Sequence, residues 1–179
     1  FGCCRSNFHF AWPKFVQSLW MKTADNGLAA AAYGPCTVTA AAGGAQVTVE
    51  ETGSYPFGPD VELAFRAGTA KFPLKLRIPG WCRAPQVTVN GEAVSGVKPG
   101  SFCTVDRAWK PGDEVSLRFP MDVGVSTGWD QNAAAVTRGP LLYALKLAYE
   151  DQTVGSYEVP FEKRTVGDLN GFPRHEIRA

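Results

Sequence analysis

Apolar residues recur at helical spacing near the start of the chain and at alternate positions after it. Phe8, Trp12, Phe15 and Leu19 stand at i, i+4, i+7 and i+11, so they lie on one face of a predicted helix over residues 7–22. Pro13 interrupts this pattern, because it lacks a backbone donor and favours a kink. The turn-forming run Asp25-Asn26-Gly27 predicts the end of the helix.

After Gly27 the pattern changes to short segments of alternating polarity separated by glycine, proline and asparagine. Gly43-Gly44 and Asn90-Gly91 are the strongest signals for tight turns between paired strands. Strands at this spacing are typical of an antiparallel sandwich or barrel. The predicted strands are 28–33, 37–39, 46–50, 61–66, 72–78, 86–89, 102–105, 114–119 and 133–147.

The fold class is therefore mainly β: an antiparallel, jelly-roll-like β-sandwich preceded by one long N-terminal helix. We expect three parts, with the helix in residues 1–27, the sandwich in 28–149 and a tail in 150–179. One further strand is possible over 154–161, and the polar, glycine-containing sequence after Glu162 is expected to be loosely ordered.

Composition narrows the function classes only slightly. The 179 residues include 18 basic and 17 acidic side chains, for a net charge of +1 and no long run of one sign. Neither nucleic acid nor a membrane is expected as a partner, because there is no basic stretch and no apolar run near the ~20 residues that span a bilayer.

The five cysteines do not form a dense disulfide framework. Cys36, Cys82 and Cys103 fall in or beside predicted strands, where buried free thiols are expected, with a disulfide among them as the alternative. Cys3 and Cys4 are adjacent, and neighbouring cysteines pair with each other only under strain. They are better suited to holding a metal with other ligands or to remaining reduced.

Other candidates are isolated. His9 follows the cysteine pair by about one helical turn, but such a histidine is more often a surface residue, and His175 lies in the polar tail. Trp81 and Trp109 stand at strand ends, where packing is expected, whereas Trp129 and Asp130 stand in a predicted loop, with Trp129 the best candidate for an exposed aromatic. Asp113, in Pro-Gly-Asp, is expected to be a turn residue.

Several segments together resemble one enzyme family. The chain from Gly2 to Asn7 (GCCRSN), with WPKFV and SLWM in the following helix, is similar to the β-L-arabinofuranosidase family of glycoside hydrolases, family 127. Downstream, SYPF, FPLKLRIPGWC, VTVNG, WKPGD and RGPLLYA are similar in order and spacing, so the resemblance covers residues 1–147.

The resemblance implies a fold and a chemistry. Members have an (α/α)6-barrel catalytic domain followed by β-sandwich domains, and a zinc ion bound by one glutamate and three cysteines. It implies Cys3 as nucleophile and zinc ligand and Cys4 as a second zinc ligand. The third cysteine, the glutamate ligand and the acid/base glutamate precede the pair in the family, so this chain is expected to be a C-terminal fragment with an incomplete zinc site.

Two functions follow from the resemblance and from the sandwich. The first is part of a retaining, zinc-dependent glycosidase for L-arabinofuranosides or related plant sugars, inactive as an isolated chain. The second is a non-catalytic sandwich, either a scaffold or a carbohydrate-binding module. We also expect self-association through Phe8, Trp12, Phe15 and Leu19, because an apolar helix face requires cover.

Overall fold

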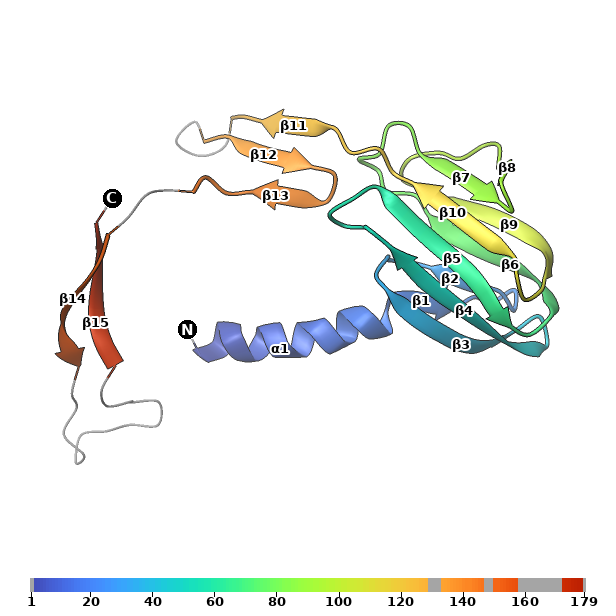
Figure 1. Ribbon diagram of the computed structural model, residues 1–179, viewed down its shortest axis with the longest axis horizontal. Helices are drawn as coiled ribbons and strands as arrows, with labels where there is room; N and C mark the ends of the chain where they lie inside the picture. The colour runs from blue at the N-terminus through green and yellow to red at the C-terminus, as the bar shows by residue number, and fades with distance from the viewer. Residues whose placement is uncertain (1, 129–132, 147–149, 158–171, 179) are drawn as a thin grey trace, which may run out of the picture. The chain divides into compact units, whose positions relative to one another are not determined.

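The computed structural model describes residues 2–128, 133–146, 150–157 and 172–178, shown in Figure 1. The chain divides into two compact units, Phe1–Tyr143 and Ala144–Ala179. In the described part, no helix is both long and apolar enough to span a bilayer.

The first unit begins with one helix, α1 (Gly2–Gln17). Pro13 lies inside it. The helix ends in a tightened turn, in which the backbone N–H of Ser18 donates to the carbonyl of Phe15 at 3.0 Å. Every described side chain from Asn7 to Gln17 is exposed.

The predicted end of the helix is wrong by five residues. Residues 20–22 form strand β1 (Trp20–Lys22), which pairs antiparallel with β2 (Leu28–Ala30). Leu19 continues the helical spacing, but it lies beyond the helix and is buried in the sandwich core. The turn at Asp25-Asn26-Gly27 exists, with Asn26 at φ 57°, but it joins two strands instead of ending the helix.

Two sheets form the sandwich, and Figure 1 shows them overlying one another. The four-stranded sheet has the order β1-β2-β6-β9, in which β2 and β6 are parallel and the other neighbours antiparallel. The six-stranded sheet is antiparallel, with the order β3-β4-β5-β10-β7-β8. The remaining strands are β3 (Cys36–Ala42), β4 (Ala45–Gly53), β5 (Asp60–Ala67), β6 (Ala70–Arg77), β7 (Gln86–Val89), β8 (Glu92–Ala93), β9 (Phe102–Trp109) and β10 (Glu114–Arg118).

Alternation along these strands builds one shared core. On β6, Phe72, Leu74 and Leu76 point inward, and on β5 Val61, Leu63 and Phe65 do so from the opposite sheet. Trp109 is fully buried, with its ring stacked on Phe65 at 4.5 Å between centroids. The sandwich predicted from the alternation is thus confirmed.

Both predicted tight turns are confirmed. Gly43 and Gly44 have φ of 56° and 84°, and Asn90 and Gly91 have φ of 51° and 83°. Positive φ at both central residues is the requirement of the hairpin turn that matches strand twist. The first turn joins β3 to β4 and the second joins β7 to β8.

The predicted strand 133–147 is instead a hairpin with a turn at Gly139-Pro140. Its strands are β12 (Ala135–Arg138) and β13 (Leu141–Tyr143), and β11 (Val123–Ser126), which the sequence did not predict, completes a three-stranded sheet. Gly139 has φ 58°, a conformation in which a continuous strand cannot proceed.

The second unit contains an antiparallel pair, β14 (Glu150–Tyr157) and β15 (Phe172–Arg178). The predicted strand at 154–161 begins earlier, and residues 158–161 lie outside the described residues. The expectation of loose order after Glu162 is wrong for Phe172–Arg178, because backbone pairing with β14 orders a segment that has no clear apolar period.

Candidate functional site

The adjacent cysteines lie in the first turn of α1. Cys3 and Cys4 are both exposed free thiols, and their Sγ atoms are 3.7 Å apart. The helix places two soft sulfur ligands side by side in solvent.

The separation of these sulfurs fits a shared metal ion. With Zn–S bonds of about 2.3 Å at a tetrahedral centre, two sulfurs on one zinc are roughly 3.8 Å apart. The same separation is also ordinary contact between two thiols, so the geometry permits a metal without requiring one. Within the described residues, no group of three or more histidine, cysteine, aspartate or glutamate side chains is arranged to hold a metal.

The two histidines add no ligand to this pair among the described residues. His9 is exposed, and its ring meets the edge of Phe8 at 6.3 Å between centroids. The side chain of His175 lies outside the described part of the chain.

Carboxylates are also absent from the neighbourhood of the pair in the sequence. The first acidic residue of the chain is Asp25, beyond the end of α1. The helix that carries the thiols therefore supplies no carboxylate as general acid or base for chemistry at Cys3.

The other three cysteines are free thiols, as predicted. Cys82 and Cys103 are buried, and burial raises the pKa of both. Cys36 is half-buried, and burial together with the nearby Glu51 carboxylate raises its pKa to about 11. These thiols are protonated and unreactive at neutral pH.

Two of the three tryptophans considered as stacking platforms, Trp109 and Trp81, pack within the sandwich. Trp109 is in the core and donates from Nε1 to the carbonyl of Phe72 at 3.1 Å. Trp81 packs edge-on to Phe119 at 6.4 Å between centroids. Trp129 and Asp130 lie outside the described residues, so their expected exposure stays a prediction.

A buried carboxylate that the sequence did not reveal lies near the end of α1. Glu51 is only 2% exposed. Its Oε2 accepts a hydrogen bond from Trp20 Nε1 at 2.7 Å, and its Oε1 accepts one from the backbone N–H of Gly34 at 2.7 Å. Burial raises the pKa of Glu51, although these donors partly oppose the shift. The only sequence signal was a glutamate at an inward position of an alternating strand.

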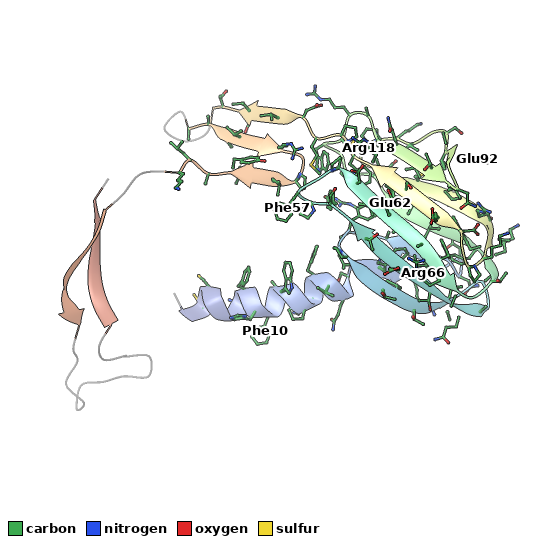
Figure 2. The ribbon with its side chains drawn as sticks, viewed as in Figure 1. Phe10, Phe57, Glu62, Arg66, Glu92 and Arg118 are labelled. Atoms are coloured by element: carbon green, nitrogen blue, oxygen red, sulfur yellow. The ribbon has the colours of Figure 1, made fainter. Side chains whose placement is uncertain are left out.

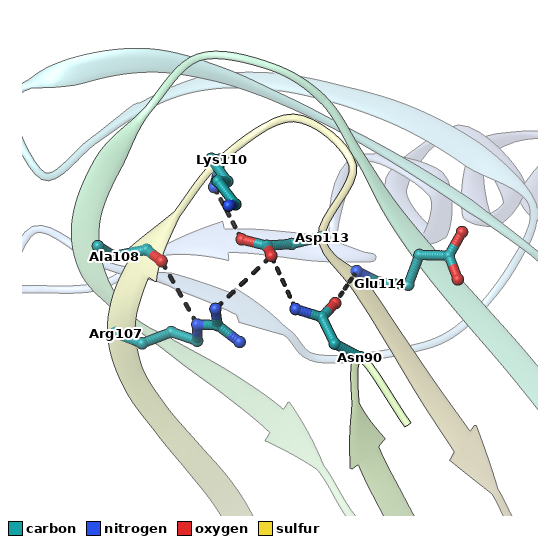
Figure 3. A network of polar contacts seen from close by, with 6 residues as sticks. All are labelled: Asn90, Arg107, Ala108, Lys110, Asp113 and Glu114. Atoms are coloured by element: carbon teal, nitrogen blue, oxygen red, sulfur yellow. Dashed lines mark hydrogen bonds and ion pairs between the residues drawn. The ribbon is translucent and has the colours of Figure 1, made fainter. Parts of the chain in front are cut away.

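Asp113 is the second buried carboxylate of the described residues, and it has the turn role predicted for it (Figure 3). It accepts hydrogen bonds from Asn90 Nδ2 at 2.8 Å and from the backbone N–H of Lys110 at 2.9 Å, with Arg107 at 3.6 Å. Burial acts to raise its pKa, but these hydrogen bonds and the positive charges outweigh burial and lower it. Asp113 closes a turn and is far in sequence from Cys3 and Cys4.

An apolar groove lies between α1 and the sandwich within the first unit. Its volume is about 500 Å³, and Trp12 and Phe15 of the helix face Tyr33, Tyr55 and Arg77 across it. The helix thus meets the sandwich only near its C-terminal end, and much of its apolar surface lies open.

Comparison with known proteins places this fold among the glycoside hydrolases. A GH127 β-arabinofuranosidase matches over 67% of this chain and 22% of its own, with 25% identity and a TM-score of 0.61. A protein described as a glycoside hydrolase matches over 67% of this chain and 21% of its own, with 29% identity and a TM-score of 0.58. A GH127 β-L-arabinofuranosidase from Geobacillus stearothermophilus shares the fold over 98% of this chain and 33% of its own, with 24% identity and a TM-score of 0.70.

The family model for the GH127 β-L-arabinofuranosidase middle domain matches residues 27–121, which is more than half of the chain. The chain therefore belongs to the GH127 family, as the sequence resemblance implied. It spans about a fifth to a third of the length of these solved relatives. No curated protein matches the chain.

Proposed function

We propose that the chain is part of a retaining glycoside hydrolase that acts on L-arabinofuranosides or related plant sugars, with Cys3 as its nucleophile. Membership of GH127, whose members compared above are β-arabinofuranosidases, supports the reaction class. The exposed Cys3–Cys4 pair on α1 supports the site, and it is the observation that carries the proposal.

The chemistry proceeds by two displacements. The Cys3 thiolate attacks the anomeric carbon, a C–S bond forms, and the glycosidic C–O bond breaks as an acid protonates the departing oxygen. Water, deprotonated by the same acid/base residue, then attacks the anomeric carbon and releases the thiolate. Two inversions give net retention of configuration.

Cys3 and Cys4 would hold a zinc ion in this proposal. The bound metal would keep the thiols deprotonated at neutral pH, where an unassisted cysteine is mostly protonated. Cys4 would then serve as a ligand, and Cys3 would be both ligand and nucleophile.

The isolated chain is proposed to be inactive. Residues 1–24 contain no carboxylate to serve as acid/base, and the described residues bring no third ligand to the cysteine pair. The C-terminal position of the chain within a longer enzyme, with α1 belonging to the catalytic helical domain, is part of the same proposal.

A scaffold role is the second candidate for the sandwich itself. Trp109 is fully buried and cannot act as a platform for a sugar, and the half-buried Trp81 packs edge-on to Phe119. Calorimetric titration of the chain with arabinan oligosaccharides is expected to give no binding heat. Saturable binding would favour a carbohydrate-binding module instead.

Activity measurements test the enzymatic proposal. The chain alone, with zinc added, should release no product from an aryl β-L-arabinofuranoside. In the complete gene product that contains these residues, Cys3→Ser should lower kcat/KM by roughly three orders of magnitude or more. Cys4→Ser should lower both zinc content and activity, and a chelator should do the same.

Cys82→Ala is the matched control, because it removes a buried thiol away from α1. It should leave zinc content and kcat/KM unchanged. Hydrolysis by the chain alone would overturn the proposed inactivity, and a Cys3→Ser enzyme with normal activity would overturn the nucleophile.

A further inference from the structure

Glu51 occupies a position that the packing pattern reserves for an apolar residue. Val47, Val49 and Glu51 alternate along β4, and all three are buried. A buried carboxylate is costly unless its oxygens are hydrogen-bonded, so an apolar side chain would serve a simple core better. The departure from the pattern points to a specific role.

The hydrogen bonds of Glu51 connect strands of two different sheets, which share no backbone hydrogen-bond ladder. Trp20 belongs to β1 of the four-stranded sheet, whereas Glu51 belongs to β4 of the six-stranded sheet. The same carboxylate accepts from Gly34, in the loop between β2 and β3, and Cys36 Sγ lies 3.9 Å from Oε2. One side chain therefore ties the two sheets together at the strand that follows α1.

The helix has few other attachments to the sandwich among the described residues. Its side chains from Asn7 to Gln17 are exposed, and burial begins at Leu19. The Leu19 carbonyl accepts from the backbone N–H groups of Ala31 at 2.8 Å and Ala32 at 3.2 Å. The contacts of Leu19 and Trp20 with the sandwich therefore determine the direction of α1. Glu51 binds the side chain of Trp20.

We propose that Glu51 is a positioning residue that fixes the direction of α1 on the sandwich, and with it the place of the Cys3–Cys4 pair. The importance of Glu51 for catalysis rests on the proposed function. The effect of Glu51 on the direction of α1 does not, so an experiment can refute either claim without refuting the other.

The test measures the distance between α1 and the sandwich by electron spin resonance. Spin labels are attached at Phe10→Cys on α1 and Glu92→Cys on β8, both exposed positions (Figure 2), in a Cys3→Ser, Cys4→Ser, Cys36→Ala background. The remaining thiols, Cys82 and Cys103, are buried.

Glu51→Leu should replace the single narrow distance of the parent protein by a broad distribution. Trp20→Phe, which removes the N–H donor and keeps an aromatic ring of smaller size, should broaden the distribution in the same way. It provides the test if Glu51→Leu fails to fold. Asp113→Asn is the matched control, because it disturbs the other buried carboxylate and should lower stability without changing the distance.

A narrow, unchanged distance in folded Glu51→Leu or Trp20→Phe would overturn the proposal. Equal broadening in Asp113→Asn would also overturn it, because the effect would then follow general stability. The distance measurement does not depend on enzymatic activity, so its outcome is independent of the proposed role of Cys3.

Discussion

The two buried carboxylates respond to their surroundings in opposite directions. Glu51 is bonded only by neutral donors, and burial raises its pKa. Asp113 faces Arg107 and several N–H donors, and these lower its pKa despite burial. The sign of each shift fixes how each residue affects stability as pH changes.

We predict opposite pH dependences for the two residues. The stabilisation from Asp113 is present above its ordinary pKa and is lost as pH falls through its lowered folded-state pKa. The contribution of Glu51 is largest below its ordinary pKa and is lost as pH rises through its raised folded-state pKa.

Urea unfolding at a series of pH values checks this prediction. Asp113→Asn should lower the free energy of unfolding at neutral pH by about 1–3 kcal/mol, because its amide leaves buried donors unpaired. In strong acid, the free energy of unfolding of Asp113→Asn should fall less with decreasing pH than that of the parent protein. Between mild acid and neutrality, the free energy of unfolding of Glu51→Gln should change less with pH than that of the parent protein. Curves parallel to the parent protein for both variants would contradict the assignment.

The residue scale also shows why the sequence predicted some roles and missed others. Asp113 stands in Pro-Gly-Asp, so local turn chemistry was sufficient to place it. Glu51 is defined by Trp20, Gly34 and Cys36, which come from other segments. Nothing local to β4 indicates those donors.

At the scale of elements, local sequence signals predicted the turns between strands better than they predicted where the helix ends. The hairpin at Asn90-Gly91 requires positive φ at adjacent residues, which these residue types supply. The end of α1 depends on Leu19 and Trp20 entering the sandwich, and this is a tertiary effect that helical spacing does not contain. The ion pairs Arg66–Glu50 and Arg118–Asp60 lie on the six-stranded sheet, and Figure 2 shows Arg66 and Arg118 there.

We predict that one glycine between β5 and β6 is required for close packing. Gly68 has φ 83°, and a Cβ there would lie 2.2 Å from the carbonyl oxygen of Gln46. Gly68→Ala should therefore destabilise the sandwich by more than the roughly 1–2 kcal/mol expected for left-handed backbone alone.

Gly44→Ala is the matched control for this change. Gly44 has nearly the same φ, 84°, but a Cβ there would meet nothing within 4 Å. Thermal unfolding should show the larger loss for Gly68→Ala. Equal losses in the two variants would mean that the close approach to Gln46 has no energetic weight.

At the scale of the whole molecule, the main feature is the exposed apolar face of α1. Leu19 leaves the predicted face because it is buried in the sandwich, which reduces the face to Phe8, Trp12 and Phe15. These side chains are 68%, 62% and 45% exposed. Exposed apolar faces of this kind promote association.

We therefore predict that the isolated chain self-associates through this reduced face. Sedimentation velocity should show a concentration-dependent increase in mass, and the triple variant Phe8→Gln, Trp12→Gln, Phe15→Gln should abolish it. Phe57→Gln, at an exposed phenylalanine of the sandwich, is the control and should have no effect. A parent protein that stays monomeric at high concentration with its helix intact would refute the prediction.

The sandwich and the family could be predicted from the sequence because each depends on patterns within this chain. Alternation and turns define the fold, and segments from GCCRSN to RGPLLYA carry the family resemblance. A complete catalytic site could not be derived, because a thiol pair without a neighbouring carboxylate supplies only part of the proposed chemistry.

Trapping of the sugar on Cys3 tests the central claim most directly. The complete gene product would be treated with an activated β-L-arabinofuranoside that slows the second displacement, digested, and analysed by peptide mass spectrometry. The account predicts one pentofuranosyl group on the peptide containing Cys3, and none in Cys3→Ser. A sugar attached to a carboxylate instead, or turnover in Cys3→Ser at the parent rate, would contradict it.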